Sequence, residues 1–399
     1  MKKKMPKILV ICPDLPFPVR AGGQMRMASL IKGISAFAHV HVACIAPAVP
    51  EETLSWFKEL GISGQCSGNG RPGALKFWCE RAAPYFTGCN LRYRGQEQDF
   101  FSRVYHRIEP DLVWLETPYL VRYALAWQER VPLVVDYWGT SEGLERIYNA
   151  TSGLLKVLRF WQWRIARSTE EKFARSIANI VTVSELDASY FRGISPESRV
   201  RAIPCGIIKE SRDTYAVHGN ESHTMIFTGD LAYGPNVDAA VFFAKEIFPI
   251  IRREFADAEV HFVGRNPTNE VIKLGAMTNV KVTGFIPDLD DAIREAVLYI
   301  LPMRLGSGIR SKLFDVFPLG KTIVTTSIGA EGLELHHNQN CLIADSPEEF
   351  ARACIRGLRE PCLRERLRSA ARNLATEVYS QSNITRLLKE AVDEFLLNR

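Results

Sequence analysis

PMRLGSGIRSKLFDVFPLGKTIVTTSIGAEG, residues 302–332, is the stretch around which the rest of the chain is organised. The apolar run at 298–301 stops at the proline that opens this stretch, which predicts the end of a buried strand. A glycine loop at 306–308 follows, and the apolar positions within 313–317 predict a helix. A glycine ends that helix, and the β-branched run 322–326 predicts the next strand.

Two cations, Arg310 and Lys312, follow the glycine loop directly. Backbone N–H groups at a helix N-terminus, together with cations, make a favourable binding site for phosphate oxygens. Asp315 lies a little further along and is expected to accept hydrogen bonds from sugar hydroxyls. The alternative is a tight strand-to-helix turn that carries surface charges, because a G-x-G pair is a weak motif by itself.

The length and composition of the chain predict a globular protein of two domains. A chain of 399 residues exceeds the size at which single cores stop growing, and its apolar fraction of 46% is ordinary. The net charge of +5 is uneven, since residues 1–205 carry 27 Lys and Arg against 19 Asp and Glu. This excess favours an anionic acceptor, a lipid phosphate or a membrane surface as the partner of the first half. Ordinary variation in surface charge is the alternative.

The cysteines and the lengths of the apolar runs indicate the cellular compartment of the protein. Nine cysteines without a C-x-x-C motif, several of them in strand-like runs, are typical of a reduced cytosolic protein. The first apolar run, 8–12, is too short for a signal peptide, and no run approaches the ~18 residues of a membrane span. We therefore expect a cytoplasmic protein, for which any membrane contact would be peripheral, at the inner face.

The N-terminal part of the chain has the pattern of a βαβ unit. Residues 7–12 predict a strand, 24–37 a helix and 40–45 a second strand, which implies a parallel sheet. Gly22 and Gly23 lie before the helix, at the carboxyl end of the first strand, where such sheets bind ligands. No G-x-G-x-x-G occurs there, which argues against a nicotinamide-dependent oxidoreductase.

Two acidic residues mark the ends of later strands in this half. Glu116 follows the apolar run 112–115, and Asp136 ends the run 132–136. Carboxylates at this edge of the sheet are candidates for positioning an acceptor. Each of them is alternatively a helix cap.

A long helix predicted over about 154–178 begins with a segment, 156–167, that mixes basic and aromatic residues at helical spacing. One interpretation is that this face lies on a bilayer interface. The alternative is an amphipathic helix that packs Leu158, Trp161 and Ile165 on its own sheet.

The second half predicts another α/β domain. A polar linker begins near 206, so we expect one domain at 1–205 and another at 206–379. The amphipathic helix at about 380–399 can pack on either domain, including back on the first.

Predicted strands of the second domain run into glycines, which are Gly229, Gly264, Gly284 and Gly306. Four strand–glycine junctions are therefore expected at one edge of one sheet, which predicts a ligand cleft. The D-x-D pattern that begins at Asp288 is interpreted as a helix start rather than a metal site, because acidic residues suit a helix N-terminus.

Four segments, 227–239, 263–265, 282–287 and 302–332, resemble family 4 type glycosyltransferases of the GT-B fold, the glycosyl transferases group 1. The nearest resemblance is to the bacterial branch associated with exopolysaccharide and cell-surface sugar transferases. It implies an α/β protein of two facing Rossmann-like domains with parallel sheets and an interdomain cleft. The N-terminal domain is then expected to bind the acceptor and the C-terminal domain the nucleotide-sugar donor, with no metal ion and no further cofactor.

The resemblance also implies roles for individual residues. The donor diphosphate is expected to contact the two early glycines and the 306–312 loop, with Arg310 and Lys312 as catalytic candidates beside Asp136 and Glu116. The donor-binding candidates are Gly22, Gly23, Gly229, Arg265, Phe285, Ile286, Ser307, Gly308, Ile309 and Asp315. Ser307 departs from the family pattern, because members often have at this position a glutamate that touches the donor sugar.

The expected activity is that of a retaining, hexosyltransferase-like enzyme. Its donor would be a nucleotide-diphosphate sugar, and its acceptor a hydroxyl of a glycan, a lipid-linked sugar or a small molecule. The expected partners are this donor, an anionic or glycan acceptor and a membrane surface contacted through the basic N-terminal domain, with no nucleic acid. Two alternatives share the donor site: a GT-B sugar-nucleotide epimerase and a non-catalytic sugar-nucleotide-binding protein.

Overall fold

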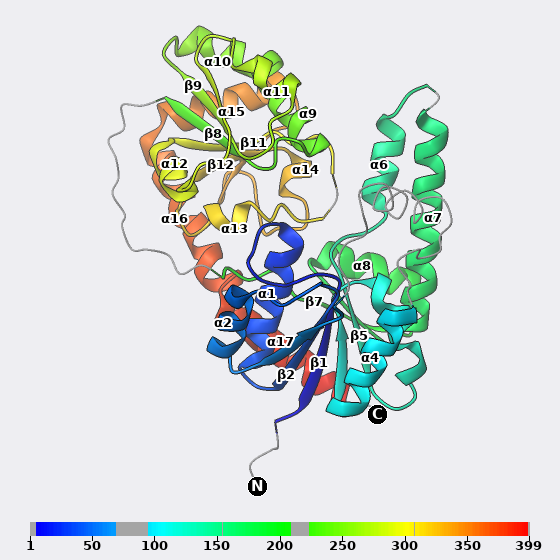
Figure 1. Cartoon of the computed structure of the whole chain (residues 1–399). Coiled ribbons are helices and arrows are strands. Elements are labelled where there is room, and N and C mark those ends of the chain that lie inside the picture. The colour runs from blue at the N-terminus through cyan, green and yellow to red at the C-terminus, as the bar shows by residue number, and fades with distance from the viewer. Residues whose placement is uncertain (1–4, 69–94, 154, 209–222, 307, 398–399) are drawn as a thin grey trace. The chain divides into compact units, whose positions relative to one another are not determined.

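The chain forms two compact units in the computed structural model (Figure 1). Unit 1 comprises Met1–Ile208 and Gln381–Arg399, and unit 2 comprises Lys209–Ser380. The structure describes residues 5–68, 95–153, 155–208, 223–306 and 308–397. Within these residues each unit contains one parallel sheet with helices on its faces.

The sheet of unit 1 has seven strands in the order β3-β2-β1-β4-β5-β6-β7, and every neighbouring pair is parallel. The interior strand β1 is buried on both faces, so its apolar run has no alternation, as expected for a sheet covered by helices. The strands are β1 Lys7–Cys12, β2 His39–Cys44, β3 Ser63–Cys66, β4 Leu112–Leu115, β5 Leu133–Tyr137, β6 Asn179–Thr182 and β7 Arg199–Ala202.

Helices cover the two faces of this sheet and form two apolar clusters. One cluster contains Leu9 and Ile11, and the other contains Ile8 and Val10 from the same strand. The helices are α1 Gly22–Ser35, α2 Glu51–Glu59, α4 Gly95–Ile108, α5 Val121–Ala124, α6 Glu142–Ala150, α7 Leu155–Ser176, α8 Glu185–Ile194 and α17 Gln381–Leu397, with 3-10 turns η1 Pro118–Leu120 and η2 Leu125–Trp127.

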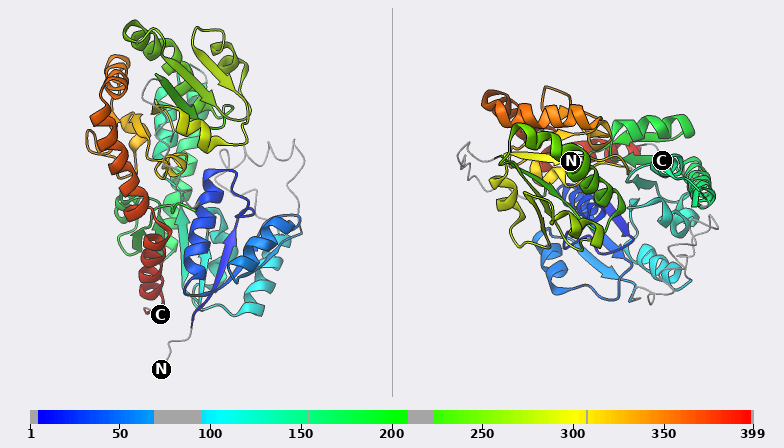
Figure 2. Two further views of the ribbon diagram at one scale, coloured as in Figure 1. Left: turned by 90° about the vertical axis from the view of Figure 1, so that its left-hand side faces the viewer. Right: turned by 90° about the horizontal axis from the view of Figure 1, so that it is seen from above.

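The C-terminal helix α17 packs beside α1 in unit 1, although most of the chain separates the two helices in sequence (Figure 2). Gly33 of α1 allows this close approach, because a Cβ atom at that position would lie 2.5 Å from the side chain of Leu388. The amide of Gln381 adds a hydrogen bond of 2.8 Å to the carbonyl of Ser29. The last helix therefore completes the core of the first unit.

The sheet of unit 2 has six parallel strands in the order β10-β9-β8-β11-β12-β13. The strands are β8 Thr224–Thr228, β9 Glu259–Val263, β10 Val280–Thr283, β11 Leu298–Leu301, β12 Thr322–Thr325 and β13 Leu342–Ile343. The helices are α9 Gly234–Phe242, α10 Phe248–Glu254, α11 Asn269–Leu274, α12 Leu289–Glu295, α13 Leu313–Val316, α14 Ser327–Ala330, α15 Pro347–Arg359 and α16 Pro361–Asn373, with π-helical turns η3 Phe243–Ile247 and η4 Leu374–Val378.

Two expectations about helices need correction. Helix α1 begins at Gly22, so the two early glycines form its first turn rather than the preceding loop. The segment expected to pack Trp161 on the sheet instead leaves 55% of that side chain exposed. Among the described helices none is both long and apolar enough to cross a membrane.

Candidate functional site

The strand–glycine junctions of unit 2 lie along one edge of its sheet, which confirms the expected convergence. Strands β10, β9, β8 and β11 are consecutive neighbours and parallel, so their carboxyl ends share that edge. The amide of Gly229 donates to the carbonyl of Val263 at 3.0 Å, and the amide of Gly264 donates to Thr283 at 3.3 Å. Ligand sites of open parallel sheets form at this edge.

Gly229 and Gly264 bring two strand ends into direct backbone contact. A Cβ atom at Gly264 would lie 1.7 Å from the carbonyl oxygen of Gly229, which leaves no room for any side chain. A Cβ atom at Gly229 would lie 3.0 Å from the ammonium of Lys312. The two glycines therefore let the backbone and this ammonium approach closely at the end of β8.

Two groups hold Lys312 at this point. Its Nζ donates to Oδ1 of Asn236 at 2.9 Å and lies 4.2 Å from the centre of the Phe227 ring. Asn236 is oriented in turn, because its Nδ2 donates to the carbonyl of Asp230 at 2.9 Å. The segment after Gly229 has no basic residue of its own, and Lys312 supplies one from a loop distant in sequence.

The charge state of Lys312 is adjustable. Burial, with the nearby charge of Arg310, lowers the pKa of Lys312 to about 7. The positive charge of Arg310 repels the charged form of Lys312, and a bound anion would offset this repulsion. The pair is therefore suited to a ligand that brings negative charge.

The loop between β11 and α13 holds three cations, and they have different environments. Arg310 is buried, and its guanidinium lies against Gly306, where a Cβ atom would be 2.6 Å from Nη1. Gly306 has a φ of 116°, which side-chain-bearing residues rarely adopt. Arg304 instead forms a bidentate ion pair with Asp238 at 2.7 and 3.1 Å and lies over the ring of Phe242. Arg304 thus anchors the loop on α9, and Arg310 lies beside the strand–glycine edge.

The other donor candidates of unit 2 lie around this edge with varied exposure. Arg265 is exposed and donates to Asp230 at 3.0 Å, and 77% of Phe285 is exposed. Ile286, Ile309 and Asp315 are partly exposed, and Gly308 adopts a φ of 69°. Ser307 lies outside the described residues.

The two candidate carboxylates of unit 1 lie at the carboxyl edge of its sheet, and both are fully buried. Asp136 forms a bidentate ion pair with Arg26 of α1, at 2.7 Å to Nη2 and 3.0 Å to Nε. Arg26 also donates to the carbonyls of Ile203 and Thr182. Burial opposes the charged form of Arg26, but the charge and hydrogen bonds of Asp136 outweigh it and raise its pKa. One guanidinium therefore fastens α1 to the ends of three strands.

Glu116 lies beside this ion pair, but within the described ranges it has no such counter-charge of its own. Among the described residues neither of its carboxyl oxygens has a hydrogen-bond partner of normal geometry. Burial and the negative charge of Asp136 raise the pKa of Glu116 well above its usual range, although Arg26 and Trp114 oppose the shift. The surroundings of Glu116 therefore favour its neutral form, because a second buried anion beside Asp136 would lack a counter-charge.

The helix-cap alternative for these carboxylates is wrong. Thr117 occupies the N-cap position of η1, and Ser141 occupies that of α6. Glu116 and Asp136 therefore have roles at the strand ends other than helix capping.

The N-terminus of α1 contains the predicted Gly22 and Gly23. Its N-cap residue, Ala21, provides no side-chain hydrogen bond, and the first turn has no acidic residue. Gly23 packs against Trp138, since a Cβ atom there would lie 2.5 Å from the indole ring. The uncapped N–H groups and the positive end of the helix dipole suit an anion.

Sequence reasoning missed Arg26, Asn236 and Trp138. Arg26 left the clearest signal, because a charged residue among apolar helix positions requires a buried partner. Asn236 and Trp138 carried no such local signal.

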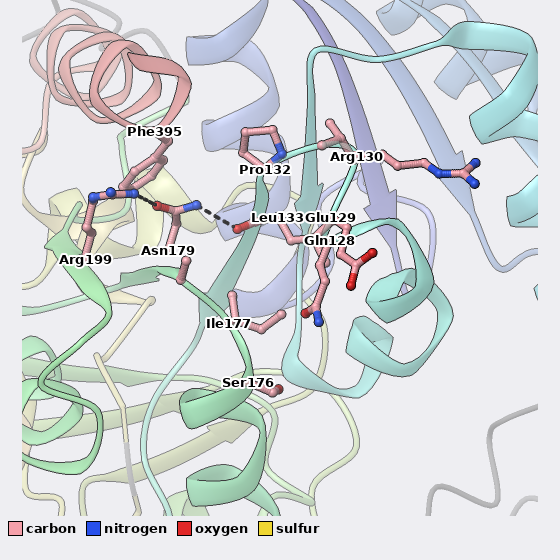
Figure 3. A pocket seen from close by; sticks show the side chains of 12 residues that line it. Gln128, Glu129, Arg130, Pro132, Leu133, Ser176, Ile177, Asn179, Arg199 and Phe395 are labelled. Atoms are coloured by element: carbon pink, nitrogen blue, oxygen red, sulfur yellow. Dashed lines mark hydrogen bonds between the residues drawn. The ribbon is translucent and has the colours of Figure 1, made fainter. Parts of the chain in front are cut away.

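One pocket, of about 390 Å³, lies elsewhere in unit 1 (Figure 3). It is lined by the first residues of β5, β6 and β7, which are Leu133, Asn179 and Arg199, and by Phe395 of α17. Asn179 bridges its neighbours there, donating to the carbonyl of Leu133 at 3.0 Å and accepting from Arg199 at 3.3 Å. These strand starts lie at the sheet edge opposite the candidate carboxylates, so the pocket is separate from the candidate site.

Within the described ranges no group of His, Cys, Asp and Glu is arranged to hold a metal ion. The side chain of Asp288 accepts a hydrogen bond of 3.1 Å from the amide of Asp291 at the start of α12. This contact confirms that the D-x-D pattern begins a helix.

Comparison with family models identifies both halves of the chain. A model described as a glycosyl transferase 4-like domain matches residues 21–206, and the model of glycosyl transferases group 1 matches residues 222–360. The chain belongs to the group 1 glycosyltransferases. Its two parallel-sheet units are the two domains of the α/β GT-B fold.

Solved structures share this fold at low sequence identity. Sucrose-phosphate synthase from Thermosynechococcus elongatus has a TM-score of 0.72 at 11% identity, covering 99% of this chain and 100% of that one. HepE from Anabaena, in complex with UDP-glucose, has a TM-score of 0.66 at 13% identity, covering 98% and 100%. A TarM variant from S. aureus, in complex with UDP and alpha-GlcNAc-glycerol among other ligands, has a TM-score of 0.69 at 9% identity, covering 99% and 100%.

A curated relative from Klebsiella pneumoniae is described as an uncharacterized 44.6 kDa protein in the cps region. It is 24% identical to this chain over 139 residues. The match spans 33% of this chain and 36% of that protein.

Proposed function

We propose that this glycosyltransferase is a retaining enzyme that moves a sugar from a nucleotide-diphosphate donor to an acceptor hydroxyl, without a metal ion. The observation that carries the proposal is the position of Arg310 and Lys312. Both cations lie at the strand–glycine edge of unit 2, where Gly229 and Gly306 allow close approach. Two cations at this edge can neutralise a diphosphate that is otherwise often neutralised by Mg²⁺.

The reaction requires a nucleoside diphosphate to leave as the acceptor hydroxyl attacks. Negative charge grows on the leaving phosphate, and cations placed in advance stabilise that charge in the transition state. In the proposed mechanism the phosphate also takes the proton of the acceptor hydroxyl, so that no strong protein base is needed. Asp315 is proposed to bind the ribose hydroxyls of the donor.

Unit 1 is proposed to bind the acceptor, in line with the expectation from sequence. Asp136 is committed to Arg26, so we assign it to holding α1 in place. Glu116 is the better candidate for contact with the acceptor, because among the described residues its carboxyl oxygens have no hydrogen-bond partner of normal geometry. The N-terminus of α1, with Gly22 and Gly23, is proposed to bind a phosphate group.

The complexes of structural relatives support the donor class. HepE was solved with UDP-glucose, and the TarM variant with UDP and a glycosylated glycerol. The cps-region relative supports a polysaccharide or other cell-surface glycan as the acceptor. A uridine nucleotide is therefore the first donor to test.

A thermal-shift screen against nucleoside diphosphates and their sugars tests the donor assignment. Binding to the native state adds about 2.7 kcal/mol of stability when the ligand is a hundredfold above its Kd. We expect a raised Tm with one nucleoside diphosphate and its sugar, and no shift with the matching nucleoside. A flat response across the panel would count against a donor site. Donor consumption without any acceptor would indicate an epimerase, and binding without turnover would indicate a non-catalytic protein.

The pKa of Lys312 predicts how donor affinity depends on pH. The free enzyme loses the charge of this ammonium above about pH 7, whereas a bound diphosphate favours the charged form. The Kd of the nucleoside diphosphate should therefore rise with pH above 7, by at most about tenfold per unit, with proton uptake on binding. Calorimetry in buffers of different ionisation enthalpy measures that uptake. Lys312→Met should bind weakly at every pH without the uptake, and a wild-type Kd that stays constant between pH 7 and 9 would contradict the assignment.

A further inference from the structure

Helices α6 and α7 form a hairpin that stands away from the sheet of unit 1 (Figure 1). Only the last part of α7 joins the apolar core, through Phe173 and Ala174. In the part of the chain that the structure describes, the first part of α7, up to Arg167, contributes no residue to either apolar cluster of this unit. The core of the unit therefore does not explain why the hairpin exists.

Large apolar side chains are concentrated on the outside of this hairpin. The exposed fractions are 65% for Leu155, 59% for Val157 and 55% for Trp161. Val157 and Trp161 are four residues apart and lie on one helix face, beside the exposed Arg164. Tryptophan beside cations is typical of a surface that meets the interface of a membrane.

The charge of the hairpin has a single sign over most of its length. Residues 146–169 contain five Lys and Arg and no Asp or Glu. Lys156, Arg159 and Arg164 are exposed. A solvated helix ordinarily mixes both signs, so this stretch is complementary to an anionic surface.

Aromatic packing between the two helices makes the hairpin a firm support. Tyr148 of α6 stacks on Trp163 of α7 with ring centres 5.7 Å apart, and Phe160 packs against both rings. The ammonium of Lys156 lies 5.3 Å from the centre of the Tyr148 ring. The exposed side chains are thus presented from an ordered scaffold.

We propose that the α6–α7 hairpin docks unit 1 on the surface of an anionic lipid bilayer. Val157 and Trp161 enter the interfacial region with Arg164 beside them, and Lys156 and Arg159, on other faces of the same end of α7, add to the attraction of the lipid phosphates. Contact of this kind is peripheral and depends on both the charge and the apolar side chains. It would place an acceptor carried by a lipid close to the domain that binds it.

Vesicle co-sedimentation of the full chain tests this surface. We expect binding to vesicles of phosphatidylcholine mixed with phosphatidylglycerol, weakened by salt, and little binding to phosphatidylcholine alone. Lys156→Gln/Arg159→Gln/Arg164→Gln should lower the partition coefficient roughly 100-fold, since each cation near an anionic membrane contributes about fivefold. Val157→Ser/Trp161→Ser should lower it roughly tenfold or more, because two apolar side chains leave the interface.

A matched variant removes the same charge elsewhere on unit 1. Lys58→Gln/Arg103→Gln/Arg130→Gln replaces three exposed cations outside the hairpin and should leave binding within about threefold of wild type. An equal loss in this variant, or no binding by the wild type, would overturn the proposal. A dimer that becomes monomeric with Val157→Ser/Trp161→Ser, without vesicle binding, would assign the surface to a second copy instead. Binding is measured without donor, so its outcome is independent of sugar transfer.

Discussion

Arg310→Ala is expected to lower kcat by about 10²–10³-fold and to raise the KM for the donor sugar nucleotide. The guanidinium is buried beside the strand–glycine edge and packs on Gly306. A charge that is already oriented stabilises the leaving diphosphate more in the transition state than in the bound donor, because the negative charge grows as the bond breaks. The loss should therefore appear in kcat as well as in KM.

Two further variants separate the charge of Arg310 from its geometry and from its position in the loop. Arg310→Lys keeps the charge without the planar fork and should recover part of the lost rate. Arg304→Gln removes a cation six residues away that is paired with Asp238, so it should reduce stability more than turnover. Circular dichroism and thermal melting of each variant check the fold. Normal sugar transfer by Arg310→Ala would show that the diphosphate-binding site has been assigned to the wrong residues.

The helices and strands could be predicted from sequence where neighbouring residues determine where each of them begins or ends. Apolar runs that end at glycine or proline located β1 at 7–12 and the four junctions of unit 2, because strand ends and turns depend on neighbouring residues. The resemblance to group 1 glycosyltransferases then indicated how the two sheets are used. Local patterns located Gly229 and Gly264, but not their direct backbone contact.

Contacts between distant residues could not be predicted in this way. Lys312 and Asn236 are 76 positions apart, and Arg26 and Asp136 are 110 positions apart. Each pair depends on how helices pack at the end of a parallel sheet, which no local pattern encodes. The exposure of Trp161 is a related case, because helical spacing shows that one face is apolar without showing whether the core covers it.

The buried ion pair between Arg26 and Asp136 carries the second large prediction. Arg26→Met should lower the free energy of unfolding of unit 1 by about 3–5 kcal/mol, because it leaves Asp136 buried without a counter-charge. Asp136→Leu should be destabilising to a similar degree, since it leaves a buried guanidinium. The double variant Arg26→Met/Asp136→Leu removes both charges and should be more stable than either single variant.

Tryptophan fluorescence makes this measurement specific to one unit. All seven tryptophans of the chain lie between residues 56 and 163, so their emission during urea unfolding reports on unit 1 alone. Lys172→Met, a change at an exposed position of the same unit, serves as the control and should cost less than about 0.5 kcal/mol. If Arg26→Met and the double variant unfold at the same urea concentration as wild type, the ion pair does not hold α1 to the sheet. If instead the single variants are destabilised and the double variant recovers stability but not sugar transfer, the pair holds the N-terminus of α1 in the position that sugar transfer requires.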